Sequence, residues 1–322
     1  MTRNKAMKPH IASTRDWRSI LFTGLILVLA LVPLLGWVYP YFIMQALCFA
    51  LFASAFNLLI GHAGLASFGH AMFFGTGGYI CAHALKVWAV PPHWAVVFAL
   101  ITTLILGLCV GLIAIRRQGI YFSMTTLALA QMLYFVYLQS PFTHGEDGIQ
   151  GFSRGHLFGL FDLNQTYVLY YVILMLFFLG HVLIARIIHS PFGDVLQAIG
   201  QNETRAQSLG YETARYKALA FVLSAGLAGL AGAMKALVTQ TASLSDVHWS
   251  MSGDVILMVL MGGMATFLGP ILGGFLFAAM LQYLSVLGQW VIVAQGTIFL
   301  ACVVMFRQGL IGTLARRLRR SL

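Results

Sequence analysis

The sequence is short of charge. Only 9% of its 322 residues are Asp, Glu, Lys or Arg, whereas 60% are apolar. A soluble domain carries roughly a quarter of its residues as charged side chains, which cover its surface. A water-soluble globular fold is therefore excluded, and the lipid bilayer is the expected solvent.

Cysteine pairs and catalytic motifs are also missing. The four cysteines (Cys48, Cys81, Cys109, Cys302) lie in apolar stretches without a C-x-x-C pair, which argues against a zinc ribbon or a disulfide scaffold. No G-x-x-x-x-G-K-[ST] phosphate loop, H-E-x-x-H or G-x-S-x-G occurs. His83 and His181 lack a second ligand at metal-binding spacing. We therefore expect no catalytic residues, no metal and no cofactor in this chain.

What the sequence does contain is long uncharged runs. No charged residue lies between Arg18 and Lys86, or between Asp254 and Arg307. The 19 basic residues outnumber the nine acidic ones and lie at the edges of these runs, which indicates membrane topology rather than nucleic-acid binding.

At about 20 residues per spanning helix, we expect about ten spans, with nine as the alternative count. Seven are expected near residues 20–39, 41–60, 66–85, 92–115, 120–140, 166–188 and 217–239. Three shorter or tilted helices fit between Asp254 and Arg307, divided at Gly269-Pro270 and Gly288-Gln289. The predicted fold is an all-α polytopic membrane protein.

Charge placement predicts the orientation of the chain. Ten spans place both termini on one side, and a cytoplasmic N-terminus then puts 16 of the 19 basic residues in cytoplasmic segments. Lys86, Arg154 and Lys235 remain outside. We expect a basic N-terminal segment (1–19), a membrane domain (20–306) and a basic tail (307–322), with both ends cytoplasmic. The first apolar run is a full span long without a small-x-small cleavage site, so we expect a membrane helix there.

Residues 189–216 form a long polar stretch inside the membrane domain. Ser190 before Pro191 is a good N-cap and first-turn pair, and Gly200 can end the resulting short helix. A second helix can start at Asn202 and stop at Gly210. Two short helices on the membrane surface would form a docking surface for a soluble partner. An ordinary interhelical loop is the alternative.

Several blocks carry a family resemblance. The run SPFGDVLQAIGQNETRAQSLGYETARYKALAFVLSAGLAGLAGA resembles the permeases of ATP-binding-cassette (ABC) importers for branched-chain amino acids, in their M-type rather than H-type subunit. GHAGLASFGHAMFFGTGGY, QGIYFSMTTLALAQ, THGEDGIQG and GGMATFLGPILGG are similar to further blocks of that family. The chain departs from the pattern at His62, where an aromatic residue is usual, at Ala265, where glycine is common, and at RQGLIG, which lacks the usual proline.

The resemblance implies that residues 189–216 contain the helices that couple the permease to an ATP-hydrolysing subunit. The predicted coupling residues are Ser190, Pro191, Gly200, Asn202, Glu203, Arg205, Ala206 and Gly210. The implied partners are a homologous H-type permease subunit, two ABC ATPase subunits that bind ATP and Mg, and a periplasmic substrate-binding protein, in the bacterial inner membrane. Whether the permease pair is a heterodimer or a homodimer stays open.

Glycine-rich segments interrupt the spans in both halves of the chain. In transporters such interruptions mark a midplane pathway, and simple close packing is the equal alternative. Gly226, Gly229 and Gly232 are predicted to form a packing face. The predicted pathway residues are Asn57, Gly64, Ser67, Gly69, His70, Tyr121, Thr125, Thr126, Gln131, Gly262, Gly263, Thr266, Gly269 and Pro270. For His70, a hydrogen-bonded core histidine is the alternative.

Two other functions stay open. An ion-coupled secondary carrier would need ionisable residues inside its spans, and the acidic candidate is Asp254, which we expect to cap a helix at the end of its span. The second alternative function is an importer permease of the same family that transports urea or short amides. Branched-chain amino acids are the substrates that the resemblance implies.

Overall fold

The computed structural model describes Gly24, residues 28–31, Pro33, and residues 39–159, 161–306 and 309–317. The predicted basic segment 1–19, most of the first predicted span, Arg307 and the end of the basic tail lie outside the described residues.

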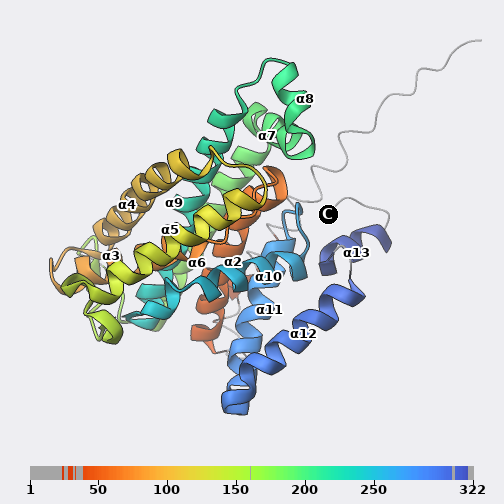
Figure 1. Ribbon diagram of the computed structural model, residues 1–322. Coiled ribbons are helices and arrows are strands. Elements are labelled where there is room, and N and C mark those ends of the chain that lie inside the picture. The colour runs from red at the N-terminus through yellow and green to blue at the C-terminus, as the bar shows by residue number, and fades with distance from the viewer. Residues whose placement is uncertain are drawn as a thin grey trace, which may run out of the picture.

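Helices make up most of the described chain (Figure 1). They are α2 (Pro40–Asn57), the π-helical turn η1 (Leu58–His62), α3 (His70–Lys86), α4 (Pro92–Ala114), α5 (Ile120–Gln139), α6 (Thr166–Ile188), α7 (Pro191–Gln201), α8 (Glu203–Ser208), α9 (Thr213–Thr239), α10 (Trp249–Gly262), α11 (Gly269–Leu284), α12 (Val291–Met305) and α13 (Gly309–Arg317), with short 3-10 turns η2 (Pro141–Thr143), η3 (Gly145–Asp147), η4 (Leu244–Asp246) and η5 (Ser285–Trp290). β1 (Ile149–Gln150) pairs antiparallel with β4 (Thr241–Ala242), and β2 (His156–Leu157) with β3 (Phe161–Asp162). The all-helical prediction is confirmed.

The central helix is α9, which packs against α2, α3 and α4. Its glycines allow this approach: a Cβ at Gly77 of α3 would lie 2.7 Å from the Cα of Gly229, and a Cβ at Gly232 would lie 2.7 Å from the carbonyl carbon of Phe74. The predicted packing face on α9 is therefore confirmed. It replaces side-chain contact by contact between helix backbones.

Within the described residues, five helical segments are long and apolar enough to cross a membrane: α2 with η1, α4, α5, α6 and α9. α10, α11 and residues 291–302 of α12 are shorter apolar helices. The predicted division of the last uncharged run is confirmed, because α11 begins at Gly269 and the chain kinks at Gly288, whose φ is +54°. The total of about ten spans and the side of each terminus stay predictions.

Asp254 does not cap a helix, so that prediction is wrong. α10 begins five residues earlier in the chain, at Trp249, and the His248 side chain is the cap, since it accepts a hydrogen bond from the backbone N–H of Ser250. The prediction placed the end of the helix at Asp254 because this residue borders the uncharged run that follows. The start of α10 is set instead by the local cap at His248.

Candidate functional site

α7 and α8 project from one end of the molecule, beyond the long helices α6 and α9 (Figure 1). We call residues 191–210 the knob. Ser190 Oγ accepts a hydrogen bond from the Gly193 N–H at 3.4 Å, and Asn202 Oδ1 accepts one from the Arg205 N–H at 3.0 Å. Pro191 is the first residue of α7, where its missing N–H has no intrahelical partner to lose. Both predicted helix starts are confirmed.

α7 ends at Gln201, one residue after the predicted end at Gly200, and the chain turns at Asn202, whose backbone is extended. Gly200 lies against the backbone that follows α2: a Cβ there would be 2.5 Å from the His62 carbonyl oxygen and 3.3 Å from the Gly64 nitrogen. Gly64 itself has a φ of +68°. The glycines let two backbones touch, so the knob is seated on the interrupted segment after α2.

Glu203 is turned inward. Its side chain is 25% exposed, and its carboxylate lies 2.5 Å from Nζ of Lys217, whose side chain is 8% exposed. Thr213 Oγ1 donates to Glu203 Oε1 at 3.1 Å. Ala206 is also buried. Sequence reasoning missed Lys217 and Thr213 as partners of the knob. The available signal was a lysine at the start of an apolar helix, with an acidic residue in the preceding polar stretch.

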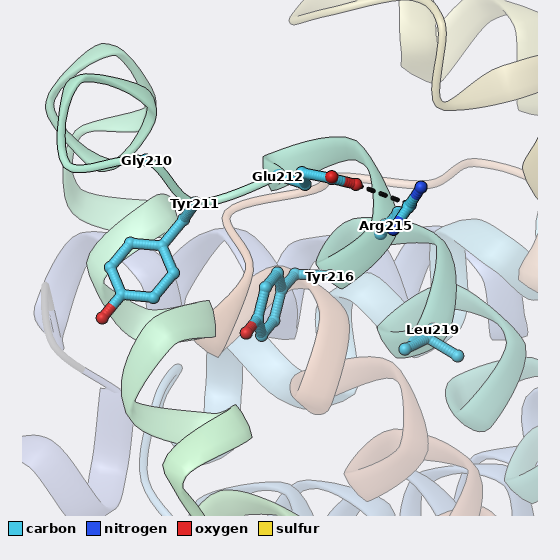
Figure 2. Close-up of a pocket in the computed structure, with 6 residues that line it drawn as sticks. All are labelled: Gly210, Tyr211, Glu212, Arg215, Tyr216 and Leu219. Atoms are coloured by element: carbon cyan, nitrogen blue, oxygen red, sulfur yellow. Dashed lines mark ion pairs between the residues drawn. The ribbon is translucent and has the colours of Figure 1, made fainter.

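The tip of the knob faces outward. Arg205, Leu209 and Gly210 are exposed, Leu209 by 71%. Next to the tip lies a pocket of about 400 Å³ lined by Gly210, Tyr211, Glu212, Arg215, Tyr216 and Leu219. Figure 2 shows the rings of Tyr211 and Tyr216 on one side and the Glu212–Arg215 ion pair on the other. The ion pair is 2.6 Å long, and both of its side chains are exposed. This surface combines apolar, aromatic and charged groups, as protein-binding surfaces do.

Asn57 joins the two interrupted segments. We call residues 58–69, between α2 and α3, the first break, and residues 263–268, between α10 and α11, the second break. At the end of α2, Asn57 Nδ2 donates to the carbonyl oxygen of Thr266, and Asn57 Oδ1 accepts from the N–H of Ala265, both at 3.0 Å. One buried side chain thus satisfies two backbone groups of the second break.

The second break is a tight turn. Thr266 Oγ1 donates to the Gly263 carbonyl oxygen at 2.8 Å and accepts from the Gly269 N–H at 3.1 Å. Gly262 and Gly269 pack backbone to backbone, where a Cβ at Gly262 would lie 3.2 Å from the Cα of Gly269. Pro270 follows in the first turn of α11. The sequence prediction that these residues interrupt a helix is confirmed.

α5 satisfies the backbone of the first break. Thr126 Oγ1 accepts from the Phe68 N–H at 3.2 Å, and Ser123 Oγ donates to the Ala66 carbonyl oxygen at 2.6 Å. Ser67 Oγ accepts from the Gly69 N–H at 3.3 Å. Ten predicted pathway residues therefore lie in the two breaks, at their edges or bonded to them: Asn57, Gly64, Ser67, Gly69, Thr126, Gly262, Gly263, Thr266, Gly269 and Pro270. Ser123 is a further member that the sequence did not single out.

The other four predicted pathway residues lie on α5 and at the start of α3. Tyr121 is 70% exposed, Thr125 Oγ1 bonds back to the Tyr121 carbonyl oxygen at 2.7 Å, and Gln131 is partly exposed further along α5. His70 is fully buried, with its Nε2 2.9 Å from Ser224 Oγ on α9. This geometry favours the core-histidine alternative for His70. A role of any of these residues in a pathway stays a prediction.

Ala265 has a left-handed backbone, with φ of +58°. Ala265→Gly is expected to raise the free energy of unfolding by up to about 1 kcal/mol. An alanine in this conformation costs roughly 1–2 kcal/mol, partly offset by the roughly 0.4–1 kcal/mol of extra unfolded-chain entropy that glycine brings. Denaturant titration in detergent, followed by circular dichroism, measures the change. The control is Ala198→Gly inside α7, which should destabilise by about 0.5–1 kcal/mol. A destabilised Ala265→Gly variant would contradict strain at this position.

Comparison with known proteins identifies the family. The family described as the permease component of branched-chain amino acid transport systems matches residues 39–307. The chain is 25% identical over 283 residues to the high-affinity branched-chain amino acid transport system permease protein LivM of Salmonella typhimurium, and equally to that of Escherichia coli, covering 79% of this chain and 65% of each relative. A probable branched-chain amino acid transport permease protein LivM of Methanocaldococcus jannaschii is 24% identical over 254 residues, 67% of this chain and 72% of that protein. The chain thus spans just under two thirds of the length of the two enterobacterial relatives.

No solved structure matches the chain. The family match covers both breaks and the whole knob, and the apolar helices agree with a protein that crosses the membrane several times. The chain therefore belongs to the permease-component family of branched-chain amino acid transport systems and is a multi-pass membrane protein.

Proposed function

We propose that this chain is the non-catalytic, membrane-spanning permease subunit of an ABC importer. The knob receives an ATPase subunit, and the breaks form part of the path that the substrate takes. The observation that carries the proposal is the contact between Gly200 and the first break, because it joins the surface open to a soluble partner directly to the interrupted helices. A displacement of the knob would therefore reach the breaks through packed backbone.

The order of contacts supports this mechanism. The knob contacts the first break at Gly64. Asn57, directly before that break, is hydrogen-bonded to Ala265 and Thr266 of the second break. Rocking of the knob would tilt the first break and pull on the two hydrogen bonds of Asn57. Such rigid movement of interrupted helices is how alternating access is achieved in other transporters.

The proposed substrates are branched-chain or related small amino acids, since the relatives are named as permeases of branched-chain amino acid transport systems. The proposed partners are a homologous H-type permease, two ABC ATPases that bind ATP and Mg, and a periplasmic substrate-binding protein. The proposed location is the bacterial inner membrane, with the knob and both termini on the cytoplasmic side. Import of urea or short amides is the alternative within the same family.

An ion-coupled carrier is the second candidate. One observation favours it: near the end of α9, Lys235 and Asp246 form an ion pair, with 16% and 11% of their side chains exposed. Buried ionisable groups of this kind mark ion paths in carriers. The two charges neutralise each other, however, and the pair holds η4 on α9, so a structural role is sufficient. The importer is the better supported function.

The double variant Arg205→Ala and Leu209→Ala is expected to lose the ATPase. Both side chains are exposed at the tip, where a partner can reach them, and arginine is enriched among the residues that dominate binding. The tagged chain is expressed in its native host, extracted in detergent and pulled down, and the ATPase retained per chain is measured. We expect at least about a tenfold decrease, which corresponds to about 1.4 kcal/mol.

The matched control is Arg117→Ala, which removes an exposed arginine from the turn between α4 and α5, outside the knob. It should retain the ATPase. Equal retention by the double variant and the control would show that the tip is not the docking surface. Absence of any ATPase on the native chain would contradict the importer.

A further inference from the structure

The six-residue helix α8 is too short to hold its own orientation in water. Its position must come from the contacts that fix it. Three of these lead to the first turns of α9: Glu203 pairs with Lys217, Gln207 Nε2 donates to Thr213 Oγ1 at 3.1 Å, and that Thr213 hydroxyl donates to Glu203 Oε1. The knob is therefore fastened to α9 by a polar cluster of four side chains.

The ion pair is the charged part of this cluster and is largely withdrawn from solvent. Lys217 and Glu203 are 2.5 Å apart with 8% and 25% of their side chains exposed, whereas the nearby pair Arg215–Glu212 has 81% and 61% exposed. Water and salt screen the exposed pair and weaken it, but screen the buried pair much less. Breaking a buried pair also leaves an uncompensated charge. The two ion pairs lie in the same stretch of chain. Of the two, only the weakly screened Glu203–Lys217 pair can transmit a displacement from α8 to α9.

α9 extends from this cluster to the opposite end of the molecule. It has 27 residues and is the longest helix in the described ranges, so it is about 40 Å long. At its other end the guanidinium of Arg154 donates to the carbonyl oxygens of Leu237 and Val238 at 2.7 and 2.8 Å, and Lys235 pairs with Asp246. Because α9 is held by charged contacts at both ends and packs on α2, α3 and α4 between them, a displacement of its first turn would be carried along the whole helix.

We infer that Lys217 and Glu203 are positioning residues for the coupling step: their ion pair forces α9 to follow α8 when an ATPase moves the knob. The inference rests on the proposed function and adds a second route to it, besides the contact of Gly200 with the first break. It also assigns Glu203 a role inside the permease instead of a contact with the partner. Docking and transmission then reside in different residues of the same knob.

The test separates docking from transmission. The permease complex is purified with its ATPases, reconstituted into liposomes with the binding protein, and assayed for ATPase retained, ATP hydrolysed and leucine taken up. For Lys217→Met we expect ATPase retention within about twofold of the native chain, but at least about tenfold less leucine moved per ATP hydrolysed. Glu203→Gln, which keeps the size of the side chain, should show the same loss. It replaces Lys217→Met in the assay if that variant does not fold.

Rescue identifies the ion pair as the cause. The swap Glu203→Lys with Lys217→Glu restores the attraction and should recover at least about half of the native leucine-to-ATP ratio. The control Arg117→Met removes an exposed cation from the turn between α4 and α5, outside both the knob and the pocket next to its tip, and should leave the ratio unchanged. A native ratio in both single variants, or a folded swap without recovery, would overturn the inference. Loss of the ATPase from the single variants would overturn it as well, since Glu203 would then be a docking residue. Absence of the ATPase from the native chain would overturn the proposed function and this inference with it.

Discussion

Gly232→Val is expected to yield little or no folded protein. Gly232 lies where α9 crosses α3, and the first atom of any side chain there would be 2.7 Å from the carbonyl carbon of Phe74 and 3.2 Å from the Gly78 nitrogen. Backbone cannot rotate away as a side chain can, so the two helices must separate. Overpacking of a core costs typically 1–3 kcal/mol, and we expect at least about 3 kcal/mol here because several residues of backbone must shift. That is a large part of the roughly 5–15 kcal/mol that stabilises a protein.

The measurement is the yield of monodisperse protein in detergent, followed by denaturant unfolding of whatever folds. Gly296→Val is the matched control, since Gly296 also lies inside an apolar helix, α12, but a Cβ there would have no neighbour within 4 Å. It should fold with nearly native yield. If the two variants behaved alike, close packing of α9 on α3 would not be what holds the bundle together.

Gly200→Val is expected to abolish most transport while the ATPase stays bound. The new Cβ would lie 2.5 Å from the His62 carbonyl oxygen, so α7 must lift off the first break. The docking tip at Arg205 and Leu209 is not altered. ATP-dependent uptake should therefore decrease at least about tenfold, corresponding to a loss of about 1.4 kcal/mol in the coupled step, with ATPase retention within about twofold of native.

Ala198→Val provides the control on the same helix, because Ala198 is exposed and a larger side chain fits there. It should transport like the native chain. Native uptake by the Gly200 variant would mean that the seat of the knob on the first break has no part in coupling. Parallel losses of uptake and ATPase binding would assign Gly200 to docking instead.

Local signals made much of this structure predictable. The starts of α7 and α8 follow from Ser190 and Asn202, whose side chains cap helices a few residues away in the chain. The division of the last uncharged run at Gly269-Pro270 follows from the backbone preferences of those two residues. Both features depend on a few neighbouring residues, and a single sequence contains all of them.

Long-range contacts were not predictable in the same way. Asn57 was singled out as a polar residue beside an interruption, but its bonds to Ala265 and Thr266 join residues more than 200 positions apart. The inward turn of Glu203 depends on Lys217 being brought next to it by the fold of the knob. Gly200 was predicted to end α7, which ends one residue later at Gln201. Its close contact with the backbone near Gly64 could not be predicted from the neighbouring residues. Each of these outcomes depends on how helices pack.

Uptake by proteoliposomes tests the central claim most directly. The complex that co-purifies with this chain is reconstituted with the binding protein, and labelled leucine uptake is measured with ATP and Mg inside or outside the vesicles, and separately under proton or sodium gradients without ATP. Our account predicts uptake that requires ATP on the side of the knob and is lost in the double variant Arg205→Ala and Leu209→Ala. Uptake by the purified chain alone, driven by an ion gradient and indifferent to ATP, would contradict it and identify the protein as a secondary carrier.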